Sequence, residues 1–567
     1  MNIQSVYEGK PWLKFYPEGC PGEIGVSDKS LPEVFDEAVA KFGDKTAIIF
    51  YGKKISYRDL GDQVNRLANA LHDLGVKKGD KVAFLLVNCP QFIIAFYAAL
   101  ELGAIITPIS PIYVSREIKH QLEDSESKHI ICQDILYDRI EKTGVSLDNV
   151  ILTSIDEYLP GLKRLFGKNV LKSVYRDMEV PIEEILKRQG FSKFQDLLKK
   201  YNPVRTEEVD INPKDDLALL PYTGGTTGLP KGVMLTHHNL LSNSENWNAF
   251  WASVFKEGEE VYMAIMPFYH IGGLEMAVVN GILRGYTLVI FTTVDLDQIL
   301  NAIVDYSATI FGSVPSLYEG LRKYEKLNLV DWKKLKVLFT GADTLLEETA
   351  IAWRKRTGTD LYEVYGLTET SLGTHCSPNG AVRIGSFGVP LPSTMAAILH
   401  PDRDEFLGTG EKGEIVIQGP QVFQGYARSE EETRMKFSNV GGVDWFRTGD
   451  LGSMDSDGYF YFYDRKRDLI KYKGYAVFAR EVEEVLVTHP QIKEVGVVGI
   501  PDANVGEIVK AVVVLEPEAR GQLSEDEIIK FCEEKLAHYK IPKVVQFRGE
   551  IPKTDVGKVS RRELREE

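Results

Sequence analysis

Three glycines and three threonines fall within the six residues from Thr223 to Gly228, and Lys231 follows shortly afterwards. The apolar run LALLPY, expected to form a buried strand, leads directly into this loop. Glycines let backbone N–H groups approach an anion closely, threonine hydroxyls add donors, and a lysine offsets negative charge. The pattern predicts a loop that binds phosphate groups, and a flexible glycine hairpin is the alternative.

This loop differs from the GxxxxGK[ST] pattern of nucleotide triphosphatases, because Pro230 precedes Lys231 and Gly232 follows it. The position after the lysine therefore lacks the hydroxyl that binds magnesium in those proteins. A phosphate-binding loop of a different class is expected.

The stretch YTGGTTGLPKG resembles the signature loop of the adenylate-forming superfamily, which contains acyl-CoA synthetases, firefly luciferase and peptide-synthetase adenylation domains. The resemblance continues in order through MPFYHIGG (266–273), FTGAD (339–343), YGLTET (365–370), RTGD (447–450), DRKRDLIKYKG (464–474) and PKTDVGK (552–558). It covers nearly the whole chain. With the long segment before the loop, the sequence looks most like the AMP-forming long-chain fatty acyl-CoA synthetases.

The resemblance implies how ATP would be bound. The triphosphate would lie on Thr223, Gly224, Gly225, Thr226, Thr227 and Gly228, with Lys231 offsetting its charge. Adenine would stack on Tyr365, with Gly341 and Ala342 on its other face, and Glu363 is placed in the same nucleotide site. Asp450 would accept the ribose hydroxyls, and Arg465 would contact the same sugar.

Four residues are expected, by the same resemblance, to act on the reacting groups. Thr368 would hydrogen-bond the α-phosphate, and Glu369 would bind Mg²⁺ with help from Thr223, as a hard oxygen ligand for a hard cation. Lys558 would bridge the attacking carboxylate and the α-phosphate in the transition state. His270 would line the carboxylate site. Outside these motifs, such residues would be a capping carboxylate, a solvated surface lysine and a neutral core histidine.

The run from Arg465 to Gly474 contains five basic residues and one acidic residue, a net charge of +4 that suits AMP or the phosphates of CoA. By resemblance, Arg467 is the hinge about which a small domain rotates, and Lys471 and Gly474 serve thioester formation. Two positions depart from the family pattern. Arg467 stands where Asp or Lys is more frequent, and Val364 precedes Tyr365 where a smaller residue is common.

Strands and helices alternate over most of the chain, as VAFLLV (82–87), TLVIF (287–291) and KVLFT (336–340) separate helical patterns. This favours an α/β fold with buried, largely parallel sheets. The resemblance implies a large N-terminal AMP-binding domain of two sheets with flanking helices plus a small β-barrel, followed by a small mobile α+β domain. The predicted ranges are 1–465 for the large domain, about 385–465 for its barrel-like part, and 466–567 for the mobile domain.

The composition is that of a globular protein, with a net charge of −15, which argues against a nucleic-acid binder. The five cysteines are scattered without zinc-ligand spacing, and the start of the sequence lacks the pattern of a secretory signal. A cytoplasmic protein is expected. The apolar stretch at 82–114 is interrupted by polar residues, so strand, helix and strand are predicted there rather than a membrane span.

Residues 161–176 contain five basic residues and no acidic ones, with apolar residues at helical spacing. A basic amphipathic helix of this kind can lie on an anionic membrane, so peripheral contact with the inner face of the membrane is one hypothesis. A helix packed on its own protein with a solvated basic face is the other, and Gly161 and Gly167 weaken the helix itself.

The resulting expectation is a two-step acid–thiol ligase with ATP, Mg²⁺ and coenzyme A. A fatty acid, ATP and CoA would give acyl-CoA, AMP and pyrophosphate through an acyl-adenylate. Long-chain acids are preferred, and medium-chain or aryl acids remain open. Loading of a carrier protein, luciferase-like oxygen chemistry and a nucleotide or acyl sensor without turnover are alternatives. The sequence leaves open whether the protein is a monomer or a homodimer.

Overall fold

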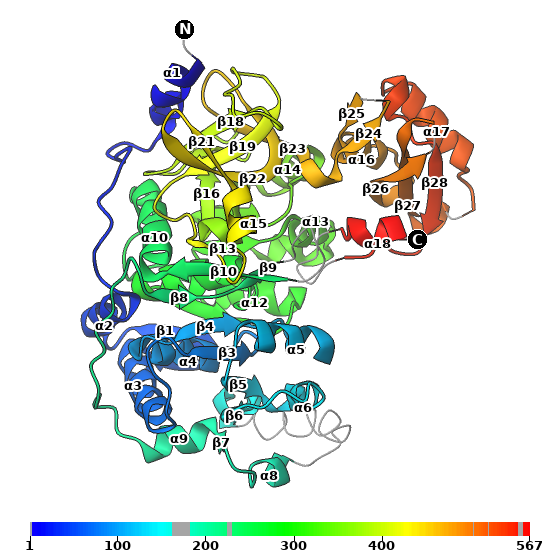
Figure 1. Cartoon of the computed structure of the whole chain (residues 1–567). Coiled ribbons are helices and arrows are strands. Elements are labelled where there is room, and N and C mark those ends of the chain that lie inside the picture. Colours follow the sequence, from blue (N-terminus) through cyan, green and yellow to red (C-terminus); the bar gives the residue numbers. More distant parts are fainter. Residues whose placement is uncertain are drawn as a thin grey trace.

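The computed structural model describes residues 3–161, 182–223, 230–473, 475–502, 504–519, 521–553 and 559–566. Figure 1 shows two large sheets with their helices, a smaller sheet beside them, and a C-terminal unit standing to one side. The α/β fold expected from the sequence is confirmed. Most of the basic segment, residues 162–176, lies outside the described residues.

The first large sheet has parallel strands at its centre, flanked by antiparallel strands at both ends. Its order in the described residues is β17 (Val389–Pro390), β16 (Leu372–Cys376), β15 (Tyr362–Leu367), β14 (Val337–Gly341), β13 (Ile310–Ser313), β11 (Val261–Ala264), β12 (Thr287–Ile290), β1 (Thr46–Phe50) and β2 (Lys53–Ser56). Successive residues of its central strands enter different cores: Tyr262 packs on one face and Met263 on the other. Burial of both faces explains the continuous apolar runs in the sequence.

The second large sheet is also parallel over most of its width. Its order in the described residues is β20 (Gly425–Tyr426), β10 (Lys231–Thr236), β8 (Leu217–Leu219), β4 (Ile105–Pro108), β3 (Lys81–Leu85), β5 (His129–Gln133), β6 (Asn149–Thr153) and β7 (Phe191–Lys193), with β9 (Tyr222–Thr223) paired to β10. The predicted strand, helix and strand at 82–114 are β3, α4 (Pro90–Glu101) and β4.

Helices cover both large sheets. The helix α3 (Tyr57–Asp73) is capped by Ser56, which accepts a hydrogen bond from the Asp59 N–H at 3.0 Å. A central core lies between the sheets with α3 and α4, and two further cores lie outside them. The other helices described in this part of the chain are α1 (Ile3–Glu8), α2 (Leu31–Phe42), α5 (Ser115–Asp124), α6 (Tyr137–Glu141), α8 (Ile182–Ile185), α9 (Phe194–Lys200), α10 (His237–Trp251), α11 (Ile271–Gly273), α12 (Leu296–Asp305), α13 (Pro315–Lys323), α14 (Glu347–Thr357) and α15 (Glu430–Met435).

Two smaller sheets follow the large ones in the chain. The first is antiparallel and contains β18 (Met395–Leu399), β19 (Gly413–Gln418), β21 (Phe437–Val440), β22 (Val443–Met454) and β23 (Phe460–Arg465). The second, with its own core, contains β24 (Ile470–Tyr472), β25 (Tyr475–Val477), β26 (Ile492–Asp502), β27 (Gly506–Leu515) and β28 (Val544–Arg548), beside α16 (Ala479–Val487), α17 (Glu525–Glu533) and α18 (Arg561–Glu566). The turn η8 (Lys466–Asp468) connects them, and the domain boundaries given from the sequence stay predictions.

None of the helices in the described ranges has the length and apolar character that a membrane-crossing segment requires. The most apolar helix, α4, is completely buried and packs against α3 and α2. Its apolar surface therefore belongs to the central core of the protein.

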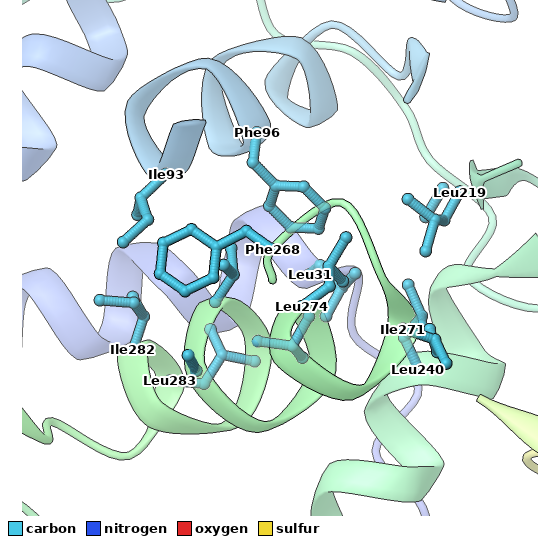
Figure 2. Packing of buried hydrophobic residues seen from close by; sticks show 14 of the residues in the cluster. Leu31, Ile93, Phe96, Leu219, Leu240, Phe268, Ile271, Leu274, Ile282 and Leu283 are labelled. Atoms are coloured by element: carbon cyan, nitrogen blue, oxygen red, sulfur yellow. The ribbon is translucent and has the colours of Figure 1, made fainter. Parts of the chain in front are cut away.

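A π-helical segment, η4 (Leu274–Gly281), follows the FYHIGG motif and packs against α10. Figure 2 shows Leu274 of this segment, with Ile282 and Leu283 after it, beneath Phe268 and the α4 side chains Ile93 and Phe96. The Glu275 side chain is 1% exposed, and neither of its carboxyl oxygens has a hydrogen-bond partner among the described residues. Burial holds the pKa of Glu275 well above its usual 4.5.

We expect Glu275→Met to raise the melting temperature, and to raise it more at pH 8 than at pH 5. Folded protein keeps a proton on Glu275 that the unfolded chain releases above about pH 4.5, so this group lowers stability as pH rises from there toward the folded-state pKa. Replacing a buried polar group that has no hydrogen-bond partner raises the free energy of unfolding by about 1–3 kcal/mol. Melting curves at both pH values measure the effect, and an equal or smaller gain at pH 8 would contradict it.

Candidate active site

The two ends of the glycine–threonine loop are held together as an antiparallel strand pair. Thr223 of β9 lies opposite Lys231 of β10, and Tyr222 lies opposite Gly232. The loop residues Gly224, Gly225, Thr226, Thr227 and Gly228 lie outside the described residues. The structure thus places Thr223 and Lys231 side by side at the base of the predicted phosphate loop.

Lys231 forms an ion pair with Glu432 of α15, and both side chains are partly buried. α15 follows β20, which pairs with β10 next to this lysine. The ammonium group is therefore oriented by a carboxylate before any ligand arrives. Glu432 belongs to none of the sequence motifs.

Glu369 lies in a tight turn, η7 (Thr368–Thr370), that contacts β10. The turn closes with two non-glycine residues at positive φ, Ser371 at 54° and Leu372 at 110°. Its closure also requires Gly366, since a Cβ there would lie 1.4 Å from the Leu372 carbonyl oxygen. Such backbone strain is characteristic of functional sites.

The Glu369 carboxylate is 8% exposed, and its Oε1 accepts a hydrogen bond from the Tyr426 hydroxyl at 2.7 Å. This neutral donor fixes the carboxylate without neutralising it. A fixed, buried, anionic oxygen fits the hard ligand that Mg²⁺ requires. Thr368 begins the same turn, so both predicted residues share one short segment beside β10.

Asp450 connects two parts of the predicted nucleotide site. Its Oδ2 accepts a hydrogen bond from the Tyr365 hydroxyl at 2.8 Å, and its Oδ1 lies 3.4 Å from Nε of Arg465. Asp450 and Arg465 face each other across β22 and β23. The carboxylate beside it raises the pKa of Arg465 further, so this guanidinium stays charged. Three predicted residues are therefore in direct contact.

One face of the Tyr365 ring is covered by Phe387, whose centroid lies 4.4 Å away with an angle of 30° between the planes. The adjacent strand β14 ends at Gly341, which pairs with Val364, and a Cβ on Gly341 would lie 2.7 Å from the Val364 carbonyl oxygen. Ala342 follows with φ at 67°. The predicted adenine-binding residues thus lie on neighbouring strands, and Phe387 was not foreseen from any motif.

Glu363 lies on β15, two residues before Tyr365, and its N–H donates to Ser377 Oγ at 3.2 Å. Burial raises the pKa of its carboxyl to about 8, and Arg480 of α16 in the C-terminal unit partly opposes this shift. Glu363 therefore lies where the nucleotide site meets the C-terminal unit. A role in binding nucleotide stays a prediction.

His270 lies in a compact turn before α11. Its N–H donates to the Pro267 carbonyl at 3.2 Å, and its own carbonyl accepts from the Leu274 N–H at 2.9 Å. The backbone at Gly273 then packs closely against the backbone at Pro267, since a Cβ on Gly273 would lie 2.2 Å from the Pro267 carbonyl oxygen. A glycine is therefore needed for this turn to hold His270 in place.

Arg467 lies in η8, the connection between the third and fourth sheets. Burial and the neighbouring Arg465 charge lower the pKa of Arg467, and Asp468 lies 3.9 Å from its Nε. The contacts described for Lys471 stay within the small sheet, where its N–H donates to Glu507 Oε2 at 2.8 Å. Gly474 and Lys558 lie outside the described residues.

An ion pair and a hydrogen bond join the C-terminal unit to β23, the strand before the proposed hinge. Arg561 of α18 lies 3.6 Å from Asp464 of β23 and 3.0 Å from Glu483 of α16. Arg480 of α16 donates to the Phe462 carbonyl at 3.1 Å. The unit is thus docked on the edge of the third sheet in this structure.

The fold brings together predicted residues from distant motifs, namely Thr223, Lys231, Tyr365, Thr368, Glu369, Asp450 and Arg465. Their supporting partners Tyr426, Glu432 and Phe387 were missed by sequence reasoning. Tyr426 lies in the stretch QVFQGY (421–426), and nothing in its residue types indicates a contact with Glu369. The chemical roles of all these residues remain predictions.

We expect Gly273→Ala to lower the melting temperature and activity, while Gly272→Ala leaves both nearly unchanged. The added methyl group at 273 meets backbone atoms that cannot move aside, whereas at 272 the nearest atom is the flexible Met266 Cε at 3.5 Å. Overpacking of this kind costs about 1–3 kcal/mol. Thermal melting of the two variants provides a matched comparison, and equal effects would refute the steric explanation.

Comparison with known protein families shows which sequences and structures this chain is similar to. Residues 35–427 match the family described as AMP-binding enzyme, and residues 481–558 match its C-terminal domain. The sequence is 39% identical over 561 residues to a long-chain-fatty-acid–CoA ligase of Bacillus subtilis, covering 98% of both chains. It is 34% identical to a protein of the same name in Escherichia coli O157:H7, again over 98% of both chains.

Solved structures share the fold. ATP-bound MatB from Rhodopseudomonas palustris aligns with a TM-score of 0.81 and 28% identity, over 95% of this chain and 99% of that one. A long-chain-fatty-acid–CoA ligase from Archaeoglobus fulgidus aligns with a TM-score of 0.67 and 27% identity, over 94% and 99%. Matching sequence, fold and motif geometry along almost its entire length, the chain belongs to the family of AMP-binding enzymes.

Proposed function

We propose that this protein is an AMP-forming ligase that joins a long-chain fatty acid to coenzyme A through an acyl-adenylate. The observation that carries the proposal is the contact of Tyr365 and Arg465 with the buried Asp450 carboxylate, beside a turn that presents Glu369. A carboxylate between a tyrosine and an arginine suits a ribose, and a neighbouring acid suits the magnesium of ATP. The long-chain-fatty-acid–CoA ligases among its relatives support the same activity.

In the first step, a carboxylate oxygen of the fatty acid attacks the α-phosphorus of ATP. A new oxygen–phosphorus bond forms while the bond to pyrophosphate breaks, so negative charge builds up around the α- and β-phosphates. Lys231 lies at the base of the phosphate loop, and Lys558 is proposed to stabilise the transition state. Magnesium held by Glu369 would supply charge neutralisation for the phosphates.

In the second step, the sulfur of CoA attacks the acyl carbon and the carbon–oxygen bond to AMP breaks. The thiol proton leaves, and AMP departs as a stable anion. The proposed hinge Arg467 lies in the connection to the C-terminal unit, so rotation there would exchange the residues that face the acyl group. A carboxylate is a poor electrophile, which is why adenylation must come first.

Long-chain specificity is supported by the names of the relatives and by the long insertion before the phosphate loop. The apolar segment after His270 is buried in the central core, where Leu274, Val278 and Val279 are completely covered. This segment gives structural support to the acid site. A 4-coumarate–CoA ligase of Dictyostelium discoideum, described as probable, is 30% identical, which keeps aryl acids as an alternative to be assayed.

We expect CoA-thioester formation to increase from acetate to oleate, with AMP and pyrophosphate as products. Lys558→Ala should lower adenylation about 100- to 1,000-fold, since it removes a preorganised charge from the transition state. Pyrophosphate release and mass detection of acyl-CoA across the acid series measure both effects.

Lys553→Ala is the matched control in this experiment. Lys553 lies in the same terminal motif, is exposed and pairs with Glu494 at 2.7 Å, so its loss should leave the rate within about twofold, as exposed ion pairs contribute little. Formation of ADP in place of AMP would refute the mechanism. A peak with short or aryl acids would refute the long-chain assignment alone.

We also propose peripheral contact with anionic membranes through the basic segment at 161–176, which rests on its sequence pattern. Wild-type protein should float with vesicles containing anionic lipid, and replacing Lys163, Arg164, Lys168 and Lys172 with Gln should abolish flotation. A matched variant replaces four exposed lysines elsewhere, namely Lys199, Lys256, Lys333 and Lys535. Equal flotation of the two variants would dispose of the proposal.

A further inference from the structure

We propose that His120 and Asp124 of α5 are positioning residues for ATP, because they hold the two ends of the phosphate loop from one helix. Neither residue belongs to a motif of the family pattern described above. The proposal rests on the function proposed above, and it concerns how the loop is held.

The first contact is made after the loop. His120 Nε2 lies 2.8 Å from the carbonyl oxygen of Pro230, the residue immediately before Lys231. A carbonyl only accepts hydrogen bonds, so Nε2 carries the proton and donates it. This bond fixes the backbone at the point where the chain leaves the loop and enters β10.

The second contact is made before the loop. The Tyr222 hydroxyl donates to Asp124 Oδ2 at 2.6 Å, and burial together with this carboxylate raises the pKa of Tyr222 strongly. The His120 ring also meets the Tyr222 ring edge-on, with centroids 6.4 Å apart. The residue entering the loop and the residue leaving it are thus both tied to α5.

The spacing of the two residues explains how one helix makes both contacts. His120 and Asp124 are four residues apart, so they project from the same face of α5. Ile118 and Leu122 project from another face into a core. Gln121 fixes the helix to β4, donating to Thr107 Oγ1 and to the Pro108 carbonyl, both at 2.9 Å. His120 and Asp124 together form a clamp on the two ends of the loop, and this clamp is anchored on the second sheet.

The loop needs such support because β9 contributes only two residue pairs to its hairpin in the described residues. A short two-stranded hairpin is marginally stable by itself in water. A third contact closes the arrangement: Arg428, after β20, forms an ion pair with Glu126, just after α5. A cavity of about 320 Å³ lies between these elements, lined by His120, Asp124, Pro230, Lys231 and Arg428 among others.

Loss of the clamp should weaken ATP binding more than binding of the other substrates, since the loop residues are those proposed to hold the phosphates. One neutral hydrogen bond corresponds to about a fivefold change in an equilibrium constant. We therefore expect His120→Ala to raise the KM for ATP about fivefold, and His120→Gln to stay within about twofold of wild type because its amide can still donate. The KM values for fatty acid and CoA should not change.

Tyr222→Phe and Asp124→Ala should each raise the KM for ATP about 10- to 100-fold, since a hydrogen bond to a carboxylate is stronger than a neutral one, and the double variant should be no worse than either single variant. Non-additivity of this kind identifies one shared bond. Lys119→Ala and Glu123→Ala are matched controls on the same helix, since these exposed side chains pair only weakly with each other at 3.8 Å. Both controls should behave as wild type.

The test measures ATP binding separately from turnover, by the rise in melting temperature when MgATP is titrated without fatty acid. A higher ATP midpoint in the clamp variants, with normal melting in the absence of ATP, is the expected result. Unchanged ATP midpoints in folded variants would overturn the proposal, as would equal increases in the KM for all three substrates. If wild type binds ATP but forms no acyl-CoA with any acid, the proposed function is wrong. The ATP titration still tests whether His120 and Asp124 support ATP binding.

Discussion

A single buried carboxylate, Asp450, holds residues of the predicted nucleotide site together. It is 4% exposed, it accepts a hydrogen bond from Tyr365 on the first large sheet, and it pairs with Arg465 at the end of β23. A buried carboxylate is costly unless hydrogen bonds and opposite charge surround it, so these three residues must stay in contact. The chain passes from Arg465 directly into η8, so the proposed hinge begins next to the same interaction.

The proposed hinge at Arg467 adds electrostatic repulsion to this constraint. The Arg467 side chain is 42% exposed, and desolvation together with the like charge of Arg465 lowers its pKa. The C-terminal unit opposes this repulsion with its own ion pairs, Arg561 with Asp464 and Arg565 with Asp468. Repulsion and attraction side by side suit the change of orientation that we propose for the C-terminal unit. The overall net charge of −15 makes such local clusters the means of attracting anionic substrates.

Backbone geometry supports the same site. Gly366, Gly341 and Gly273 each lie where a Cβ would approach a carbonyl oxygen closer than 3 Å, and each belongs to a different motif. Ser371 and Leu372 carry positive φ angles directly after Glu369. Close backbone packing leaves little freedom to the turns that carry Glu369 and His270. Preorganised groups of this kind stabilise charge without having to rearrange during the reaction.

The sequence by itself determined the α/β class, the strand, helix and strand at 82–114 and the order of the motifs, because these depend on local periodicity and close neighbours along the chain. Only the tertiary structure decided which residues meet, since Tyr365 and Asp450 are 85 positions apart. Nothing in the sequence reveals the supporting residues of the site, because their ordinary residue types gain a role only through a distant partner. They are His120, Asp124, Phe387, Tyr426 and Glu432. Glu275, whose carboxyl has no hydrogen-bond partner among the described residues, was equally invisible, as its burial results from the packing of η4 against α10.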